Sequence, residues 1–389
     1  MNHAAEIIAG EIANKGVISF ARFMELALYC PFYGYYERER DIIGPRGDYY
    51  TSVSVGSLFG ELLAFQFAEW LEESQVPSAG GGTSAATEVL RILEAGAHGG
   101  MLARDILVWM RDHRPALFQG LEYWIVEPSE RRQGWQRGTL VQFAAKLHWV
   151  KQVPELLGVP ASLPANRPSL PSVRGIIFSN ELLDAMPVHR LGWDAKIRMW
   201  YEWGVTMESG RFAWTRMPAT AESSVGRWQM ANGKELLDVL PDGFTVETSP
   251  AAEQWWREAA SVLECGRLVT LDYGLTADEL FVPERKEGTA RAYCHHQSSW
   301  DVLAQPGEQD ITAHLNFTAI QTAGESAGLR TDAFLTQAQF LTGIAGRVWE
   351  GGASFGEWTR ARTRQFQTLT HPEHLGRSFR VLVQSRLRA

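Results

Sequence analysis

Residues 89–107 constrain the fold of this chain more than any other segment. An apolar run ends in the acid Glu94 and a glycine-rich turn from Gly96 to Gly100, and apolar side chains then recur at helical spacing. Glycine lets the backbone approach a ligand closely, and the free amides of the following helix point towards it. The segment therefore predicts a strand, a turn and a helix that bind a nucleoside cofactor. A plain tight turn between a strand and a helix is the alternative.

The acid separates this turn from a dinucleotide-binding fingerprint. The spacing is Glu-x-Gly-x-x-x-Gly and not Gly-x-Gly-x-x-Gly. A carboxylate at Glu94 would repel a pyrophosphate but suits an ammonium and a sulfonium, so we expect S-adenosylmethionine. A second predicted strand ends in Glu127, whose carboxylate can accept hydrogen bonds from both ribose hydroxyls. A solvent-facing acid before Pro128 is the alternative interpretation of Glu127.

The composition is that of an ordinary globular protein. The 389 residues are 45% hydrophobic and 21% charged, which is enough for two or three domains. The net charge of -8 predicts no nucleic-acid partner and favours a basic, arginine-bearing one. The 3 cysteines are far apart, so we expect a reducing, cytoplasmic location and no disulfide framework. No apolar run approaches the roughly 20 residues that a membrane span requires.

Strand-like and helix-like segments alternate in the middle of the chain and predict an α/β fold. The expected core strands are 88–94, 123–127, 147–150, 175–179 and 267–272. Their alternation with helices favours a mostly parallel, Rossmann-like sheet covered on both faces. Residues 188–214 predict an inserted antiparallel meander. Residues 329–335 predict a further strand, and residues 379–384 resemble an edge strand.

The region before the core reads as helical. Ser19 is a candidate N-cap for a helix that stops at Pro31, and a second helix is expected from about Gly56 to Glu73. Four regions are therefore expected: an N-terminal helical region with a cofactor-covering loop, the first part of the core, a β-rich insertion, and the rest of the core with a C-terminal substrate-side extension. Their bounds are 1–85, 86–187, 188–245 and 246–389.

The best catalytic candidates follow the predicted strand at 175–179. In an open α/β sheet the carboxyl ends of the first and fourth strands flank the switch point, so Glu181 and Asp184 would face the reacting end of the cofactor. If residues 182–185 form a helical turn, the two acids share a face and can grip a guanidinium. Asp184 as a capping or structural acid is the alternative. Asp272 ends the next predicted strand on the same rim.

The sequence lacks the motifs of several other classes of enzyme. Histidines and acids between His295 and His314 match no metal-ligand spacing, so no metal site is predicted and residues 306–314 are interpreted as a substrate-covering loop. No Gly-x-Ser-x-Gly elbow, Walker loop or paired-cysteine motif occurs. This argues against a hydrolase, a nucleoside triphosphatase and a redox enzyme.

Several segments together resemble the MidA-like family over nearly the whole chain. They are 47–52, 59–63, 94–100, 180–189, 271–274, 306–314 and 336–341. The specific parts are Asn-Glu-x-x-Asp-Ala-x-Pro-Val-His from Asn180 and Asp-Ile-Thr-Ala-His from Asp310. The resemblance implies a class I S-adenosylmethionine-dependent methyltransferase. Mitochondrial members of the family methylate a protein arginine in a subunit of respiratory complex I during assembly.

The resemblance also implies which residues form the site. The residues expected to bind the cofactor are Asp48, Tyr49, Thr51, Ser52, Glu94, Gly96, Ala97, His98, Gly100, Glu127 and Asn180. The first four belong to a loop expected to close over the cofactor, and Asn180 lies with Glu181 and Asp184 at the methyl-transfer end.

The glycine-rich turn departs from the usual family pattern, Glu-x-Gly-Pro-Gly-x-Gly. Here Ala97 replaces the proline and His98 replaces the middle glycine. Either His98 keeps a negative φ and points aside, or cofactor affinity is weakened. Gln152 also stands where an acid near the adenine is expected.

The expected reaction is in-line methyl transfer to a guanidinium nitrogen. Glu181 would orient the guanidinium, Asp184 would be the second carboxylate, and His189 or Asp272 would relay the proton. Two alternatives stay open: a catalytically silent assembly chaperone, with His98 as the sign of a decayed pocket, and a methyltransferase for another nucleophile. The expected partner is an arginine-bearing protein, and a homodimer is left open.

Overall fold

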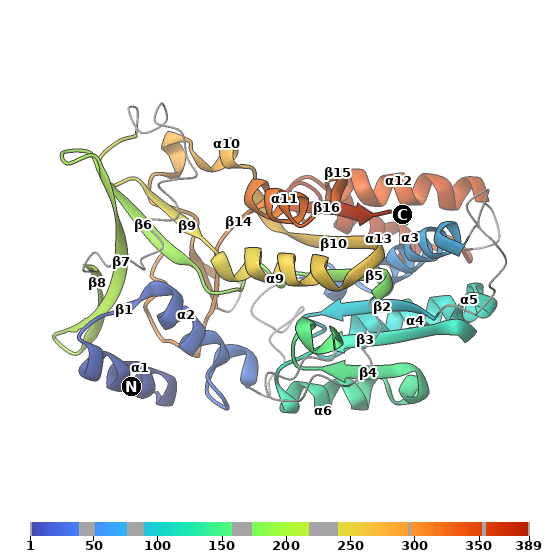
Figure 1. Ribbon diagram of the computed structural model, residues 1–389, viewed down its shortest axis with the longest axis horizontal. Helices are drawn as coiled ribbons and strands as arrows, with labels where there is room; N and C mark the ends of the chain where they lie inside the picture. The colour runs from blue at the N-terminus through green and yellow to red at the C-terminus, as the bar shows by residue number, and fades with distance from the viewer. Residues whose placement is uncertain are drawn as a thin grey trace. The chain divides into compact units, whose positions relative to one another are not determined.

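The computed structural model describes residues 2–38, 51–75, 89–157, 173–217, 240–294, 297–351 and 355–387. The chain divides into two compact units (Figure 1). Unit 1 takes Met1–Tyr49, Asp184–Glu253 and Gly274–Ala319, and unit 2 takes Tyr50–Leu183, Gln254–Tyr273 and Ile320–Ala389. The four regions expected from the sequence stay a prediction.

Unit 2 is built on a mixed sheet whose central strands are parallel. The strand order is β15-β16-β10-β5-β2-β3-β4, and β16 runs antiparallel to both of its neighbours. The strands are β2 (Leu90–Ala95), β3 (Leu121–Val126), β4 (Leu147–Val150), β5 (Val173–Asn180), β10 (Leu263–Leu275), β15 (Arg330–Thr336) and β16 (Phe379–Arg386). The predicted α/β class with a mostly parallel sheet is confirmed.

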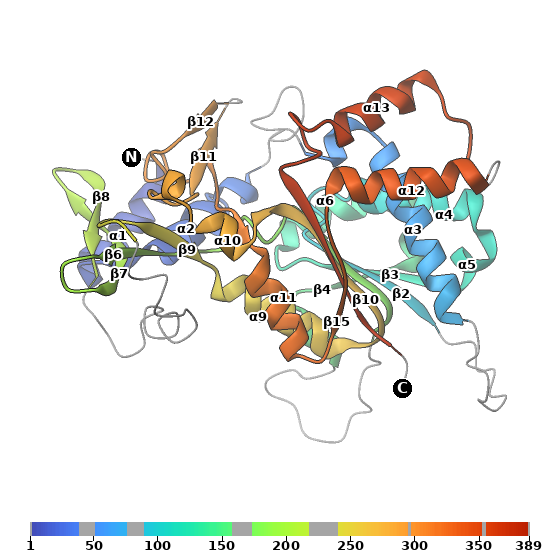
Figure 2. The ribbon, with the colours of Figure 1, turned by 90° about the horizontal axis from the view of Figure 1, so that it is seen from above.

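Helices cover both faces of this sheet (Figure 2). On one side, α3, α4 and α12 bury apolar side chains such as Leu62, Ile106 and Leu341 against the strands. The other side carries α9 and α11 (Figure 2). The helices are α3 (Leu58–Gln75), α4 (Met101–His113), α5 (Pro115–Gly120), α6 (Glu130–Thr139), α9 (Pro250–Val262), α11 (Phe317–Ser326), α12 (Gln337–Gly351) and α13 (Arg360–Thr370).

The prediction of an edge strand at 379–384 is wrong. The strand β16 lies between β10 and β15, so β15 and not β16 is the edge strand on this side of the described sheet. Gln384, the last residue of the predicted strand, has a buried side chain. It accepts a hydrogen bond from Trp256 Nε1 at 2.7 Å and donates to the Thr331 hydroxyl at 2.9 Å. A buried glutamine with partners fits an interior strand, and sequence periodicity does not reveal those partners.

Unit 1 holds two antiparallel sheets. One has the order β1-β7-β6-β9 with β8 beside β7, and the other has the order β12-β11-β13. The predicted meander is confirmed, since β6, β7 and β8 pair antiparallel in sequence order. The strands of these two sheets are β1 (Ile18–Ser19), β6 (His189–Asp194), β7 (Met199–Glu208), β8 (Arg211–Arg216), β9 (Thr245–Thr248), β11 (Arg291–Cys294), β12 (Gln297–Ser299) and β13 (Asp310–Thr312). The short strand β14 (Leu315–Asn316) pairs parallel with the end of β10 and so belongs to the mixed sheet.

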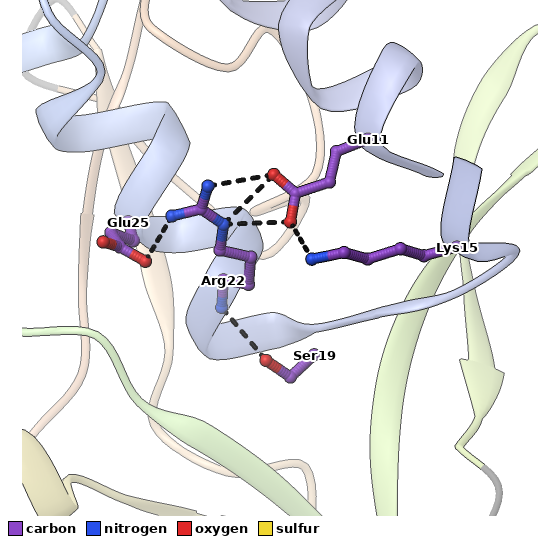
Figure 3. Close-up of polar contacts among 5 residues, drawn as sticks. All are labelled: Glu11, Lys15, Ser19, Arg22 and Glu25. Atoms are coloured by element: carbon purple, nitrogen blue, oxygen red, sulfur yellow. Dashed lines mark hydrogen bonds and ion pairs between the residues drawn. The ribbon is translucent and has the colours of Figure 1, made fainter. Parts of the chain in front are cut away.

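The N-terminal helices α1 (His3–Lys15) and α2 (Phe20–Tyr29) pack in the core of unit 1. Ser19 caps α2 as predicted, because its hydroxyl accepts from the Arg22 amide at 3.1 Å. A charged cluster joins the two helices (Figure 3). Glu11 of α1 accepts from Arg22 Nη2 at 2.9 Å and from Lys15 Nζ at 2.8 Å. Within the described ranges, no helix is both long and apolar enough to cross a membrane.

Candidate functional site

The carboxyl ends of β2, β3 and β5 lie side by side in unit 2. In the sheet register, Ala95 is paired with Val126 on one side and with Ser179 on the other. The glycine turn follows the first of these strand ends, Glu127 the second and Asn180 the third. The structure therefore brings three groups of predicted cofactor residues to one edge of the sheet.

Two glycines give the turn after β2 its shape. Gly96 has φ 76° and Gly100, the N-cap of α4, has φ 83°, which is the left-handed region that favours glycine. A Cβ on Gly96 would lie 3.0 Å from the Leu182 side chain, and one on Gly100 would lie 3.2 Å from Leu140. A side chain at either position would be strained by its φ, and the leucine that it meets would have to shift by a few tenths of an ångström.

His98 occupies the position of the usual middle glycine and takes a glycine-like conformation. Its φ is 44°, so the expected alternative in which it keeps a negative φ is wrong. The turn requires a left-handed residue here, and its peptide is held because the His98 carbonyl accepts from Gln136 Nε2 at 2.9 Å. Burial, helped by the nearby Arg132 charge, lowers the pKa of His98 to about 4. The imidazole is therefore neutral at pH 7.

Glu94 is a buried carboxyl with one neutral partner. Its side chain is 2% exposed, and the Tyr123 hydroxyl donates to Oε2 at 2.7 Å. Burial raises the pKa of Glu94 to about 7, and the Tyr123 hydrogen bond offsets only part of this effect. A cation brought close to Glu94 would favour its charged form.

Glu127 is also buried, but it is held by a cation and an amide. Its Oε1 accepts from Arg132 Nε and from the Ser129 amide, each at 2.9 Å, and its Oε2 accepts from Gln136 Nε2 at 3.1 Å. Burial raises the pKa of Glu127, and Arg132 opposes the rise. Trp149 Nε1 donates to Gln136 Oε1 at 2.9 Å, so this glutamine joins Glu127, the His98 peptide and β4.

Arg132 and Gln136 were not predicted from the sequence. Both lie on α6, directly after the strand that ends before Glu127. Their spacing of four positions places them on one helix face, in a segment where polar residues predominate. A polar helix face that follows an acid at a strand end is the signal that could have identified them.

Asn180 and Glu181 form a polar pair at the end of β5. Glu181 Oε1 accepts from Asn180 Nδ2 and from the Ser52 amide, each at 3.1 Å. Ser52 in turn donates its hydroxyl to Gln337 Oε1 at 3.0 Å. Asn180 Oδ1 is buried and has no hydrogen-bond partner in the described part of the chain. Such an acceptor is costly unless a donor reaches it, so the site fits a ligand that carries one.

The expected helical turn over 182–185 is wrong. These residues form bends and turns, and Glu181 before them has φ 51°. Their amides have another acceptor, because Asp272 Oδ2 accepts from the Leu183 amide at 2.8 Å and from the Leu182 amide at 3.3 Å. The buried Asp272 thus fixes the backbone after Glu181, and the expected helical placement of Glu181 and Asp184 does not form.

Asp184 and His189 belong to unit 1, whereas Glu181 and Asp272 belong to unit 2. The Asp184 side chain is buried, and its carbonyl accepts from the Ala313 amide at 3.1 Å. His189 Nδ1 lies 2.6 Å from Glu202 Oε1. Glu202 was not predicted from the sequence, although an acid within the apolar alternation of β7 is a signal for a buried, partnered carboxylate.

Several of the residues predicted from the sequence are not among the site contacts described above. Asp48 and Tyr49 lie outside the described residues, as do His295 and His296. Thr51 forms a turn with Ser54, whose amide donates to the Thr51 hydroxyl at 3.1 Å. In the described part of the chain, no group of three or more histidine, cysteine or acidic side chains is placed to hold a metal ion.

Comparison with known proteins gives a family match. The model of a family described as "Putative S-adenosyl-L-methionine-dependent methyltransferase" matches residues 62–335. The chain is 26% identical over 325 residues to the mitochondrial protein arginine methyltransferase NDUFAF7 of Mus musculus, covering 80% of this chain and 67% of that protein. It is 26% identical over 388 residues to the Danio rerio protein of the same name, covering 96% and 84%.

Two crystal structures from Burkholderia thailandensis share the fold. One was solved with bound S-adenosyl-homocysteine; it is 29% identical, has a TM-score of 0.78, and the match covers 98% of this chain and 92% of that one. The other is an uncharacterized protein that is 30% identical, with a TM-score of 0.75 and coverage of 98% and 91%.

Proposed function

This chain belongs to the family of S-adenosyl-L-methionine-dependent methyltransferases, and from that premise we propose that it methylates an arginine of a protein substrate. The arginine is supported by the name of the mouse and zebrafish relatives. The observation that carries the proposal is the polar pair of the buried Asn180 and the half-buried Glu181, at the edge of the sheet where the glycine turn also lies. A carboxylate in that place suits the recognition of a guanidinium.

The residues at this edge fit the cofactor. Asn180 Oδ1, which has no hydrogen-bond partner among the described residues, offers an acceptor to an ammonium or hydroxyl. The buried Glu94 offers a carboxylate whose charged form a cation would favour. A carboxylate has roughly four lone-pair sites, so Glu127 can accept from a ribose while it keeps Arg132 and Gln136. When bound, the cofactor supplies an electrophilic methyl group on a sulfonium.

The protein's own residues hold the nucleophile and take up one proton. Glu181 orients the guanidinium by a charge-assisted hydrogen bond, and Asp184 is the second carboxylate. As the nitrogen gains the methyl group it loses one proton, which His189 accepts. Glu202, 2.6 Å from His189 Nδ1, leaves Nε2 as the accepting atom. Asp272 is the weaker candidate for this proton because its carboxylate already accepts from three backbone amides.

The variant Glu181→Gln tests the proposal. The amide oxygen of glutamine still accepts from Ser52 and Asn180, so the fold and cofactor binding should persist, while methyl transfer should fall at least about a hundredfold. The measurements are calorimetric titration with S-adenosylmethionine and transfer of labelled methyl groups to fractionated cell protein, with mass spectrometry of the product.

Glu325→Gln is the matched control, since Glu325 is an acid of α11 that binds Gln321 and Thr331. It should methylate as the parent does. Full activity of Glu181→Gln would remove Glu181 from the mechanism. No heat with millimolar cofactor would favour the silent chaperone, and methylation of a residue other than arginine would identify a different nucleophile.

We further propose a cytoplasmic location and a target in a respiratory complex. The location is supported by the odd number and wide spacing of the cysteines Cys30, Cys265 and Cys294, which do not indicate a disulfide framework. The target in a respiratory complex is supported by the family resemblance. Pull-down from fractionated cells tests both proposals, because the fraction gives the location and the captured protein gives the target. A homodimer is our proposal for the assembly; light scattering tests it, because one chain has a mass of 43.5 kDa.

A further inference from the structure

We propose that Tyr29 and the segment Asp310–Ala313 are positioning elements that hold the backbone carrying Asp184. The inference rests on the proposed function, in which Asp184 is a carboxylate of the methyl-transfer site. All of the contacts that carry it lie within unit 1. It assigns a role to a helix-terminal tyrosine and to the Asp-Ile-Thr-Ala-His string, neither of which the proposed chemistry uses.

Two consecutive carbonyls are each held by a separate element. The Tyr29 hydroxyl, at the end of α2, donates to the Ala185 carbonyl at 2.9 Å. The Ala313 amide, just after β13, donates to the Asp184 carbonyl at 3.1 Å. Tyr29 is 156 positions away from Ala185 in the sequence, so this contact is purely tertiary. Residues 184 and 185 are therefore fixed from two directions.

The two holding elements also contact each other. The Tyr29 ring lies against the Tyr36 ring, with centroids 5.5 Å apart. The Tyr36 hydroxyl donates to Asp310 Oδ1 at 2.6 Å, and Asp310 is 3% exposed. Asp310 is paired with Tyr293 in the β11–β13 ladder. We call Tyr29, Tyr36, Asp310 and Ala313 the Asp184 bracket. The first three contact one another in turn between α2 and β13, and Tyr29 and Ala313 bind the carbonyls of Ala185 and Asp184.

The local conformation explains why a bracket is needed. Residues 182–185 form no helical turn, so the helical hydrogen bonds that would otherwise hold the carbonyls of Asp184 and Ala185 do not form. The Asp184 side chain is 6% exposed, and any shift of its backbone displaces a buried carboxylate. A displacement of about 1 Å in a reacting group can cost about a hundredfold in rate. Holding these carbonyls therefore controls where the carboxylate lies.

Tyr29→Phe tests the bracket because it removes one hydroxyl and keeps the ring against Tyr36. Hydrogen exchange of the Ala313 amide and of the peptide spanning 183–188 should become about five times faster, as expected for loss of one hydrogen bond. The calorimetric affinity for S-adenosylmethionine should not change. Methyl transfer to fractionated cell protein should show a lower kcat at an unchanged cofactor KM.

The matched control is Tyr201→Phe in β7. Tyr201 is also partly buried in unit 1 and also loses a hydroxyl contact, with Arg216, away from residues 184 and 185. Its exchange at Ala313 and its kcat should equal those of the parent. Tyr36→Phe is a second variant that leaves the Tyr29–Ala185 contact in place and should accelerate exchange at Ala313 through Asp310.

Each result decides the proposal. Unchanged exchange in Tyr29→Phe and Tyr36→Phe would show that no bracket holds these peptides. Faster exchange with an unchanged kcat would show that the bracket is structural and positions nothing for catalysis. If the parent transfers no methyl group at all, the proposed function fails, while the exchange measurement still reports whether the bracket exists.

Discussion

Two buried glutamates near the glycine turn show how the hydrogen-bond partner of a carboxyl affects its pKa. Glu94 has the neutral Tyr123 hydroxyl beside it, whereas Glu127 has the Arg132 guanidinium. Burial raises the pKa of both, but only Glu127 has a cation to oppose the rise. Glu94 is therefore the carboxyl whose protonation should change near neutral pH.

The raised pKa of Glu94 predicts a pH-dependent stability. The group titrates at about 7 in the folded state and near 4.5 in the unfolded state, so the folded state binds the proton more tightly. Its contribution is fully present below pH 4.5 and is lost as the pH rises through 7. The free energy of unfolding, measured with urea, should fall between pH 5 and pH 8 in the parent. In Glu94→Gln this fall should be smaller by up to about 3 kcal/mol. Parallel pH profiles of the two proteins would contradict this.

The backbone of His98 predicts a difference between two small replacements. A side chain at positive φ costs on the order of 1 kcal/mol, and glycine avoids this cost. His98→Gly should therefore be more stable than His98→Ala by about 1 kcal/mol, although both variants lose the imidazole. Thermal unfolding measures the difference, and calorimetry with S-adenosylmethionine shows whether removing the ring raises affinity. Equal stability of the two variants would show that the turn imposes no strain at this position.

At the scale of elements, local sequence signals predicted where helices and strands lie along the chain better than they predicted which elements pack side by side. Ser19 and Pro31 bound α2 as predicted, and the glycine turn begins directly after β2. The position of β16 in the sheet was wrong because strand order depends on pairing between distant segments. Gln384 looks like a surface residue in the sequence and is an interior one in the sheet.

The α1–α2 pair predicts an acid-sensitive contact (Figure 3). Hydrogen bonds from Arg22, and then from Lys15, lower the pKa of Glu11 to about 2. The carboxylate therefore contributes stability above pH 4.5, and this contribution is lost as the pH falls towards 2. Glu11→Gln should be destabilised at pH 7 by up to about 1 kcal/mol, because the pair is partly exposed to solvent, and should match the parent near pH 2.

Glu6→Gln on the same helix is the control for Glu11. Glu6 lies 3.0 Å from the exposed His3, so the loss of this solvent-exposed pair should change the unfolding free energy little. Chemical unfolding followed at both pH values separates the two variants. A Glu11→Gln protein as stable as the parent at pH 7 would show that the cluster does not stabilise the helix pair.

At the scale of the whole molecule, the chain crosses between its two units next to the predicted catalytic residues. One crossing falls between Leu183 and Asp184, inside the Asn-Glu-x-x-Asp-Ala string, and another falls between Tyr273 and Gly274, directly after Asp272. A single short motif thus contributes Glu181 to unit 2 and Asp184 to unit 1. The motif can therefore be recognised in the sequence, but the sequence does not show which unit, and which contacts, hold each acid.

The sequence by itself determined the strand, the glycine turn and the helix of residues 89–107, and the acids that follow the strands. These features depend on hydrophobic period and on the φ angles that glycine permits, which are properties of neighbouring residues. Only the tertiary structure decided that α6 supplies the partners of Glu127, that Glu202 contacts His189 and that Tyr29 holds Ala185. These contacts join residues from different elements, because a buried polar group takes the partner that the folded chain brings to it.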